Sequence, residues 1–178
     1  MPAKPRKSKP ARNTKVQAKT KAKPRAEKKS PPPVSFRELK PGDDAFLLQV
    51  TRETMGEVFE KSVGTKLTDQ MILQQIKSSG TSLIIEQNGR PIGYTSYTVY
   101  KPGTMYWGAL VLAKSAQDQG IGSGICHEMF AHAKTLGCQV IQGHVQVENT
   151  VAVKFWKTHG FEIVGGPTQG SYEIEKKL

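Results

Sequence analysis

Hydrophobic positions in the first half of the chain follow a regular pattern. Apolar and polar residues alternate in four segments, which is typical of half-buried strands, and turn residues such as "KPGDD" separate the segments. Two further segments carry the start and stop signals of helices. The pattern predicts strands at residues 34–39, 81–87, 90–100 and 104–113, and helices at residues 45–55 and 67–79.

The second half opens with the stretch "AQDQGIGSGI" at residues 116–125. Apolar residues then recur at helical spacing and predict an amphipathic helix of about four turns that ends at Gly137. A strand at 138–147 and a helix at 150–159 follow, and two closing strands occupy 161–165 and 171–178. The apolar stripe of the first of these helices contains Ile121, Ile125, Met129, Ala133 and Leu136.

The order of these elements, β, α, α, β, β, β, α, β, α, β, β, predicts the fold class. Asn88-Gly89 is a type I′ hairpin signal, so the strands before the glycine stretch are expected to be antiparallel. We therefore expect an α/β (α+β) domain with a single mixed, mostly antiparallel sheet flanked by helices. Asp43 or Asp44 and Asn149 are predicted helix N-caps, and Gly160 is a predicted helix end.

The charge is concentrated at one end of the chain. Residues 1–33 contain twelve Lys or Arg and one Glu, whereas residues 34–178 contain fourteen bases and fourteen acids. With one valine and no aromatic residue, the first segment cannot bury enough apolar surface to offset its chain entropy. We predict a disordered basic arm at 1–33, which is a candidate for binding nucleic acid, and a globular domain at 34–178.

Targeting and redox signals are weak. The sequence has no apolar run typical of a secretory signal or a bilayer span, which predicts an intracellular, cytoplasmic protein without membrane contact. The basic arm adds the alternatives of a nuclear or nucleoid-associated location. Cys126 and Cys138 lie in apolar segments without metal-ligand spacing, so we expect buried, reduced thiols and no metal site.

The glycine stretch is typical of a backbone that approaches an anion closely, because glycine has no Cβ and a following helix offers free N–H groups. A P-loop requires a Gly-Lys pair that is absent here. A dinucleotide fingerprint requires a third glycine where Ile125 stands, and hairpins precede the stretch instead of a βαβ unit. Both of these phosphate-binding classes are therefore excluded.

The remaining pattern, Gln117-x-x-Gly120-x-Gly122 between a strand and a helix, resembles the Q/R-x-x-G-x-G/A motif of the GNAT superfamily of N-acetyltransferases. A second segment, "NTVAVKFWKTHGF" at residues 149–161, is similar to the N-x-x-A-x-x-L/F-Y-x-x-x-G-F segment of the same family. The resemblance covers residues 34–178, and it does not include the basic arm.

The resemblance implies acetyl-CoA as the acetyl donor and assigns residues to it. The glycine loop would face the pyrophosphate, and the end of the preceding strand would offer backbone hydrogen bonds to the pantetheine arm. Asn149 would serve both as a helix cap and as a contact to the pantetheine, or as a helix cap only. The implied donor-binding residues are Leu110, Leu112, Gln117, Gln119, Gly120, Ile121, Gly122, Ser123 and Asn149.

The resemblance also implies direct attack of an amine on the thioester, but two of the family's usual groups are absent. Trp156 stands where the family commonly has a Tyr, and an indole N–H cannot protonate a thiolate. The strand at 104–113 contains no Glu, where many relatives keep one. His144 and Glu148 are the candidate bases, and each has a purely structural alternative as a hydrogen-bonded strand residue or a charge at a helix N-terminus.

We therefore predict an N-acetyltransferase that acts on a protein lysine, a protein N-terminus or a small amine. Glu53, Glu57 and Glu60 lie about one helical turn apart, and they either attract such a cation or form a solvated face. Trp156 and the missing strand Glu favour one alternative, a non-catalytic acyl-CoA-binding module that the basic arm tethers to nucleic acid.

Overall fold

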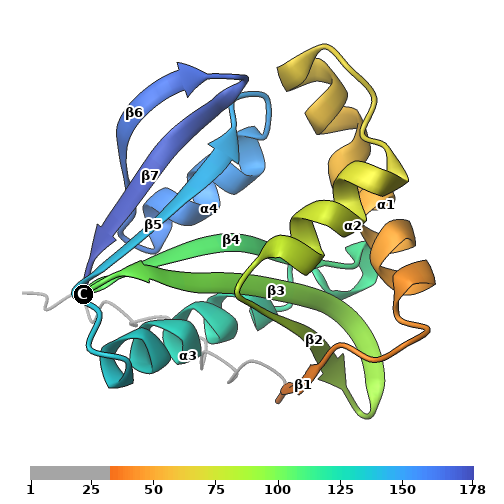
Figure 1. Cartoon of the computed structure of the whole chain (residues 1–178), viewed down its shortest axis with the longest axis horizontal. Helices are drawn as coiled ribbons and strands as arrows, with labels where there is room; N and C mark the ends of the chain where they lie inside the picture. The colour runs from red at the N-terminus through yellow and green to blue at the C-terminus, as the bar shows by residue number, and fades with distance from the viewer. Residues whose placement is uncertain (1–32) are drawn as a thin grey trace, which may run out of the picture.

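The computed structural model describes residues 33–178, and the predicted arm therefore lies outside the described residues except for Pro33. Seven strands form one sheet in the order β1-β2-β3-β4-β5-β7-β6 (Figure 1). Every neighbouring pair is antiparallel except β4 and β5, which are parallel. The strands are β1 (Ser35–Glu38), β2 (Thr81–Gln87), β3 (Arg90–Lys101), β4 (Thr104–Leu112), β5 (Val140–Gln146), β6 (Glu162–Thr168) and β7 (Ser171–Lys177).

Helices cover both faces of the sheet. Ile84 and Ile85 are adjacent on β2, so their side chains point to opposite faces, and each belongs to a different buried cluster. The Ile84 cluster contains residues of the first two helices, and the Ile85 cluster contains residues of the third. The helices are α1 (Asp44–Val63) and α2 (Asp69–Ser78) on the first face, with α3 (Ile121–Thr135) and α4 (Thr150–Thr158) on the second.

The structure confirms the predicted order of elements and the single mixed sheet. Asn88 and Gly89 both have positive φ, at 52° and 72°, as the predicted type I′ turn between β2 and β3 requires. Asn149 caps α4 by accepting a hydrogen bond from Ala152 N–H at 3.0 Å. The two cysteines are buried and free, as expected.

Three local expectations need correction. Helix α1 continues eight residues beyond the predicted end, to Val63, and stops at Gly64 in the left-handed conformation. Asp43 is the N-cap residue of α1, but its carboxylate bonds Arg37 and Lys40 N–H instead of a helix N–H. Leu136, predicted to belong to the apolar stripe of α3, is 45% exposed because it follows the last helical turn.

Strands β4 and β5 stay together for only three residue pairs. The last of these pairs is Tyr106 with Gln142, and beyond it β5 pairs only with β7. Gly143 marks the end of the close approach, because a Cβ there would meet Trp107 O at 3.0 Å. The strands then diverge, and Figure 1 shows β5, β6 and β7 leaning away from the first four strands. This leaves a gap in the middle of the sheet.

A bulge in β4 lies at the start of this gap. Ser96 pairs with Ala109 and Tyr97 pairs with Trp107, so Gly108 has no partner on β3. A buried hydrogen-bond chain holds the bulge, because Trp107 Nε1–H donates to Thr95 Oγ1 at 2.8 Å and the Thr95 hydroxyl donates to Ala109 O at 2.8 Å. Thr95 is completely buried, so its two bonds satisfy a group that has no access to water.

Among residues 33–178, no helix combines the length and the apolar character that a bilayer crossing requires. The same residues contain no group of three or more His, Cys, Asp or Glu side chains that could hold a metal ion.

Candidate active site

The glycine loop lies between β4 and α3, at the wide end of the gap. Gly120 is the N-cap residue of α3 and has φ 78°, which glycine adopts without a steric cost. The first helical hydrogen bond runs from Gly124 N–H to Gly120 O at 3.0 Å. The N–H groups of residues 121–123 therefore have no acceptor within the described part of the chain, and helix termini with such free N–H groups are suited to bind anions.

Two glutamine side chains fasten this loop to the strand and turn before it. Gln117 Nε2–H donates to Leu112 O at 2.8 Å, and Gln119 Nε2–H donates to Ser115 O at 2.5 Å. Asp118 between them has φ 59°, a left-handed conformation that Asp tolerates better than most residues. The two amides thus fasten the loop, and the acidic side chain of Asp118 between them is exposed.

On the edge of β4 that faces the gap, the backbone N–H and C=O groups of two residues point toward the gap. Ala109 O accepts from Thr95 and Ala113 N–H donates to Ile92 O at 2.8 Å, so these residues direct their backbone groups toward β3. Alternate residues of a strand point to opposite sides, and Leu110 and Leu112 therefore direct their N–H and C=O groups toward the gap. Leu112 O already accepts from Gln117.

Gly122 packs closely against α4 and the end of β4. A Cβ at this position would lie 3.3 Å from two ring carbons of Phe155 on α4 and 3.8 Å from Leu112 Cδ1. The first turn of α3, the end of β4 and the middle of α4 therefore come together at one point. Ile121, by contrast, is buried in the core with its side chain turned away from solvent, and only its backbone is available to a ligand.

Trp156 lies in an aromatic cluster on the α4 side of the gap. Its ring centroid is 5.0 Å from that of Trp107 and 5.0 Å from that of Phe161, with edge-to-face geometry in both pairs. The side chain thus packs against the strand that carries the bulge.

The two candidate bases differ in their surroundings. Glu148 is exposed, and its backbone N–H donates to Ser62 Oγ at 3.3 Å, which ties the start of α4 to the end of α1. His144 is also exposed, and its Nδ1 lies 3.0 Å from the hydroxyl of Tyr106 on β4. Burial raises the pKa of the Tyr106 phenol, so this partner of His144 stays neutral.

Sequence reasoning missed Tyr106. Its contact with His144 depends on the parallel pairing of β4 and β5, which joins residues 38 positions apart and has no local sequence signal. The only signal available was that "TMYWGAL", the strand segment that lacks a Glu, carries a Tyr at its third position. The missed residue lies on the same strand edge as the predicted donor contacts.

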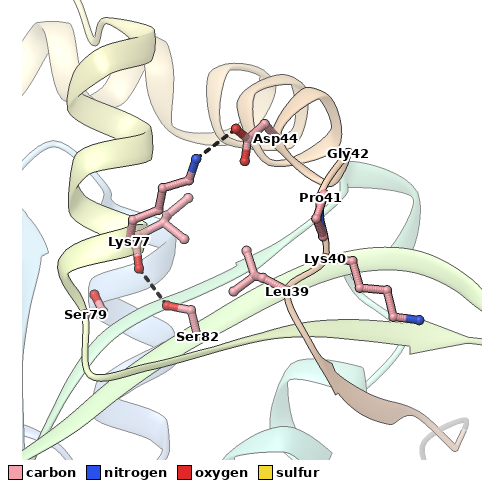
Figure 2. Close-up of a pocket in the computed structure, with 9 residues that line it drawn as sticks. Leu39, Lys40, Pro41, Gly42, Asp44, Lys77, Ser79 and Ser82 are labelled. Carbon is pink, nitrogen blue, oxygen red and sulfur yellow. Dashed lines mark hydrogen bonds and ion pairs between the residues drawn. The ribbon is translucent and has the colours of Figure 1, made fainter.

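A cavity of about 630 Å³ lies elsewhere, between the β1–α1 connection and α2. Figure 2 shows Lys77 of α2 reaching across it to Asp44 of α1, with an Nζ to Oδ2 distance of 2.9 Å, and Ser82 Oγ donates to the Ile76 carbonyl at 2.8 Å. None of the residues predicted for donor binding or catalysis lines this cavity. The gap between β4 and β5 therefore remains the candidate site.

Comparison with solved structures shows the same fold in acetyltransferases. A PaiA N-acetyltransferase from Thermoplasma acidophilum, in complex with coenzyme A, has a TM-score of 0.65 at 18% identity, over 82% of this chain and 99% of that chain. An acetyltransferase from Thermus thermophilus has a TM-score of 0.66 at 17% identity, over 82% and 97%. A GNAT family acetyltransferase from Elizabethkingia anophelis with acetyl-CoA bound has a TM-score of 0.62 at 14% identity, over 82% and 98%.

A search of curated proteins found no match. The sequence profile of the Acetyltransferase (GNAT) family matches residues 47–161, a range that extends from α1 through the glycine loop to the end of α4. This range is more than half of the chain, and it contains both motifs that carry the resemblance. The chain therefore belongs to the GNAT family of acetyltransferases.

Proposed function

We propose that this protein transfers the acetyl group of acetyl-CoA to an amine by direct attack of the amine on the thioester. The observation that carries the proposal is the set of free N–H groups at residues 121–123, placed beside the open edge of β4. An anion bound there gains the helix dipole and three backbone donors together. A pantetheine arm can then continue along Leu110 and Leu112 as an added strand.

The donor-binding residues divide by role. The backbones of Gly120, Ile121, Gly122 and Ser123 face the pyrophosphate, and the Ser123 hydroxyl adds a donor. Gln117 and Gln119 shape the loop through their bonds to Leu112 O and Ser115 O. Asn149 has its side-chain oxygen engaged with Ala152 N–H, which supports the cap as its first role and leaves its amide NH₂ as the group for the pantetheine.

The reaction requires a group that accepts the amine proton, and it requires that the CoA thiolate can leave. The amine nitrogen bonds to the carbonyl carbon, and the backbone N–H groups of β4 near the Gly108 bulge stabilise the oxyanion. His144 or Glu148 accepts the proton, directly or through water. The C–S bond then breaks and the thiolate leaves without acid from Trp156, which suits a leaving group with a thiol pKa of about 8.5.

The acceptor is an amine of one of three classes: a lysine side chain, a protein N-terminus or a small polyamine. Glu57, on the face of α1 that the sequence suggested for a cation, is engaged with Lys61 at 2.6 Å. Residues 1–33 supply a basic segment that we propose binds nucleic acid, and their lysines are themselves chemically competent acceptors.

The test has two stages. Acetyl-CoA should raise the melting temperature of the protein by an amount that grows with ligand concentration, because it binds only the folded state. A mass-spectrometric screen of lysine peptides, free N-termini and polyamines with acetyl-CoA then identifies the acceptor class. Binding without any transfer would support the alternative of a non-catalytic acyl-CoA module, and an unchanged melting temperature at saturation would eliminate both.

A further inference from the structure

Tyr106 and His144 meet at the point where β4 and β5 separate. Tyr106 Oη lies 3.0 Å from His144 Nδ1, and the two ring centroids are 5.7 Å apart. Tyr106 belongs to the last residue pair of the two strands, and His144 lies two residues beyond its partner Gln142. The two side chains therefore stand on one face of the sheet, on opposite sides of the start of the gap.

This face is the one opposite to α3. Ile141 and Val145 of β5 belong to the core cluster under α3, so the residues between them alternate to the other face. His144 is exposed there, whereas Tyr106 is half-buried. A donor held at the α3 terminus and an acceptor on the α1 face would thus approach the gap from opposite faces of the sheet.

We propose that Tyr106 and His144 form the proton-accepting pair of the reaction, with His144 as the catalytic base and Tyr106 as its positioning residue. The inference rests on the proposed acetyl transfer. As the amine nitrogen bonds to the carbonyl carbon, its proton passes to His144 Nε2. The C–S bond breaks, the electron pair leaves on sulfur, and the imidazolium later releases the proton to solvent or to the thiolate.

The contact through Nδ1 defines which nitrogen is free. An imidazole can accept the amine proton at Nε2 only in the tautomer that carries its hydrogen on Nδ1. The neutral Tyr106 hydroxyl can accept from Nδ1–H before the proton transfer and from the imidazolium afterwards. When the hydroxyl accepts in this way, Tyr106 holds the ring in the productive tautomer and orientation without adding a charge.

The pair also lies at a suitable distance from the donor loop. The four steps from Leu112 to Gly108 span about 13 Å of strand, at about 3.3 Å per residue. A pantetheine arm that follows this edge would bring the thioester toward the level of the bulge. Tyr106 is two residues further along the same strand, and His144 faces it across the gap.

The chain offers a matched comparison in a second Tyr–His pair. Tyr97 Oη lies 2.7 Å from His132, but the contact is with Nε2 and the pair lies between β3 and α3, away from the gap. The two pairs therefore use opposite ring nitrogens. All four histidines of the chain lie in the described residues, so each imidazole signal can be assigned with few variants.

The experiment is ¹⁵N NMR of the histidine rings in the full chain at neutral pH, in the wild type, Tyr106→Phe and Tyr97→Phe. We expect the Nδ1-protonated tautomer for His144, a change of the His144 signals only in Tyr106→Phe, and a change of the His132 signals only in Tyr97→Phe. An Nε2-protonated His144, or a His144 spectrum that does not respond to Tyr106→Phe, overturns the proposal. This measurement needs no acceptor.

Kinetics with acetyl-CoA and two acceptor probes, spermidine and a peptide of residues 1–33, completes the test. His144→Gln should lower kcat by about 10²- to 10⁴-fold and Tyr106→Phe by about tenfold, while Tyr97→Phe keeps wild-type turnover. Acetyl-CoA affinity should be unchanged in all three variants, because none of these residues belongs to the donor loop. Wild-type turnover in His144→Gln overturns the proposal, whereas loss of acetyl-CoA binding by the wild type would instead refute the proposed function.

Discussion

The ring of Phe155 lies 3.3 Å from the position that a Cβ would occupy at Gly122. Gly122→Val should therefore displace the ring of Phe155 and place a side chain at the first turn of α3, where the proposed donor approaches. We expect acetyl-CoA affinity to fall at least tenfold, measured by calorimetry. Wild-type affinity in Gly122→Val would mean that the donor does not approach the backbone at Gly122.

Gly56 provides the control for this substitution. It lies inside α1, and a Cβ there would meet nothing within 4 Å. Gly56→Ala should stabilise the protein by about 0.5–1 kcal/mol, because alanine loses less chain entropy in a helix, and acetyl-CoA affinity should not change. The pair of variants separates a general glycine effect from a local one.

Asp118 carries an exposed carboxylate two residues before Gly120, the N-cap of α3, and has a left-handed conformation with φ 59°. Asp118→Asn keeps a residue that tolerates this conformation and removes only the charge. We expect acetyl-CoA to bind about two- to fivefold tighter, with a difference that shrinks as salt is added, because exposed charges are screened. Weaker binding in Asp118→Asn would show that the carboxylate helps to build the loop.

Asp118→Gly adds a second comparison at the same position. It removes the charge and also the steric cost of positive φ. The unfolding midpoint should rise in Asp118→Gly and stay near wild type in Asp118→Asn, while both variants bind acetyl-CoA with similar affinity.

Trp156 packs against Trp107 with ring centroids 5.0 Å apart, at the position where relatives commonly carry a Tyr. Trp156→Tyr and Trp156→Phe remove similar volume, so the ratio of their kcat values isolates the phenolic hydroxyl. We expect Trp156→Tyr to equal or exceed the wild type, and to exceed Trp156→Phe by about tenfold or more where protonation of the thiolate limits the rate. Loss of several decades in both variants, with intact acetyl-CoA binding, would assign the indole a role of its own.

Much of the fold could be predicted from short-range pattern. Alternating residues, the Asn88-Gly89 turn and the Asn149 cap each act within a few residues of chain, and the structure confirms all three. The end of α1 was missed because Gly56 and the polar residues around it weaken the helical pattern. The Gly64 cap at φ 82° was the signal that could have located the true end.

The position of the glycine loop between a strand and a helix could be predicted for the same reason, since its glycines and its helix are contiguous in sequence. The contact between Tyr106 and His144 could not. Tyr106 and His144 meet only because two parallel strands pair for three residues and then separate, and nothing local in either segment encodes that register. The carboxylate of Asp43 likewise bonds Arg37 on β1, so a tertiary contact replaced the predicted cap.

A fall in pH should lower the free energy of unfolding through protonation of Asp43. Hydrogen bonds from Arg37 lower the pKa of this carboxyl from 3.8 to about 2. A lowered pKa means that the stabilisation is complete above pH 3.8 and is lost as the pH falls from 3.8 toward 2. Urea unfolding should show a decrease of up to about 2 kcal/mol over this interval, and Asp43→Asn should remove that part of the decrease.

Asp69→Asn is the control for this measurement. Asp69 is paired with Arg52, but both side chains are about half exposed. Exposed pairs contribute less than about 1 kcal/mol, so Asp69→Asn should keep the acid dependence of the wild type. If the two variants showed the same acid dependence of the unfolding free energy, the pair of Arg37 and Asp43 would not be the source of that dependence.

The basic arm should act independently of acetyl transfer. Residues 34–178 have no net charge, so deletion of residues 1–33 should abolish binding to duplex DNA. In the full chain, the log of the affinity should fall with the log of salt with a slope of about −0.9 for each phosphate neutralised. Transfer to spermidine should be unchanged by the deletion. Salt-dependent DNA binding by the truncated protein, or loss of transfer, would contradict this two-part organisation.

Arg37 fastens the strand that follows the arm to the rest of the sheet. It lies on β1, the four-residue edge strand that directly follows the arm, and it bonds Asp43 at 2.8 Å and Glu86 on β2 at 2.6 Å. A pulling force applied to the arm meets this clamp first, three strands away from β4 in the sheet order. β1 pairs with β2, and β3 lies between β2 and β4. If residues 1–33 bind a polyanion as proposed, a pull on the arm would load this clamp at the outer edge of the sheet before it reached the gap between β4 and β5.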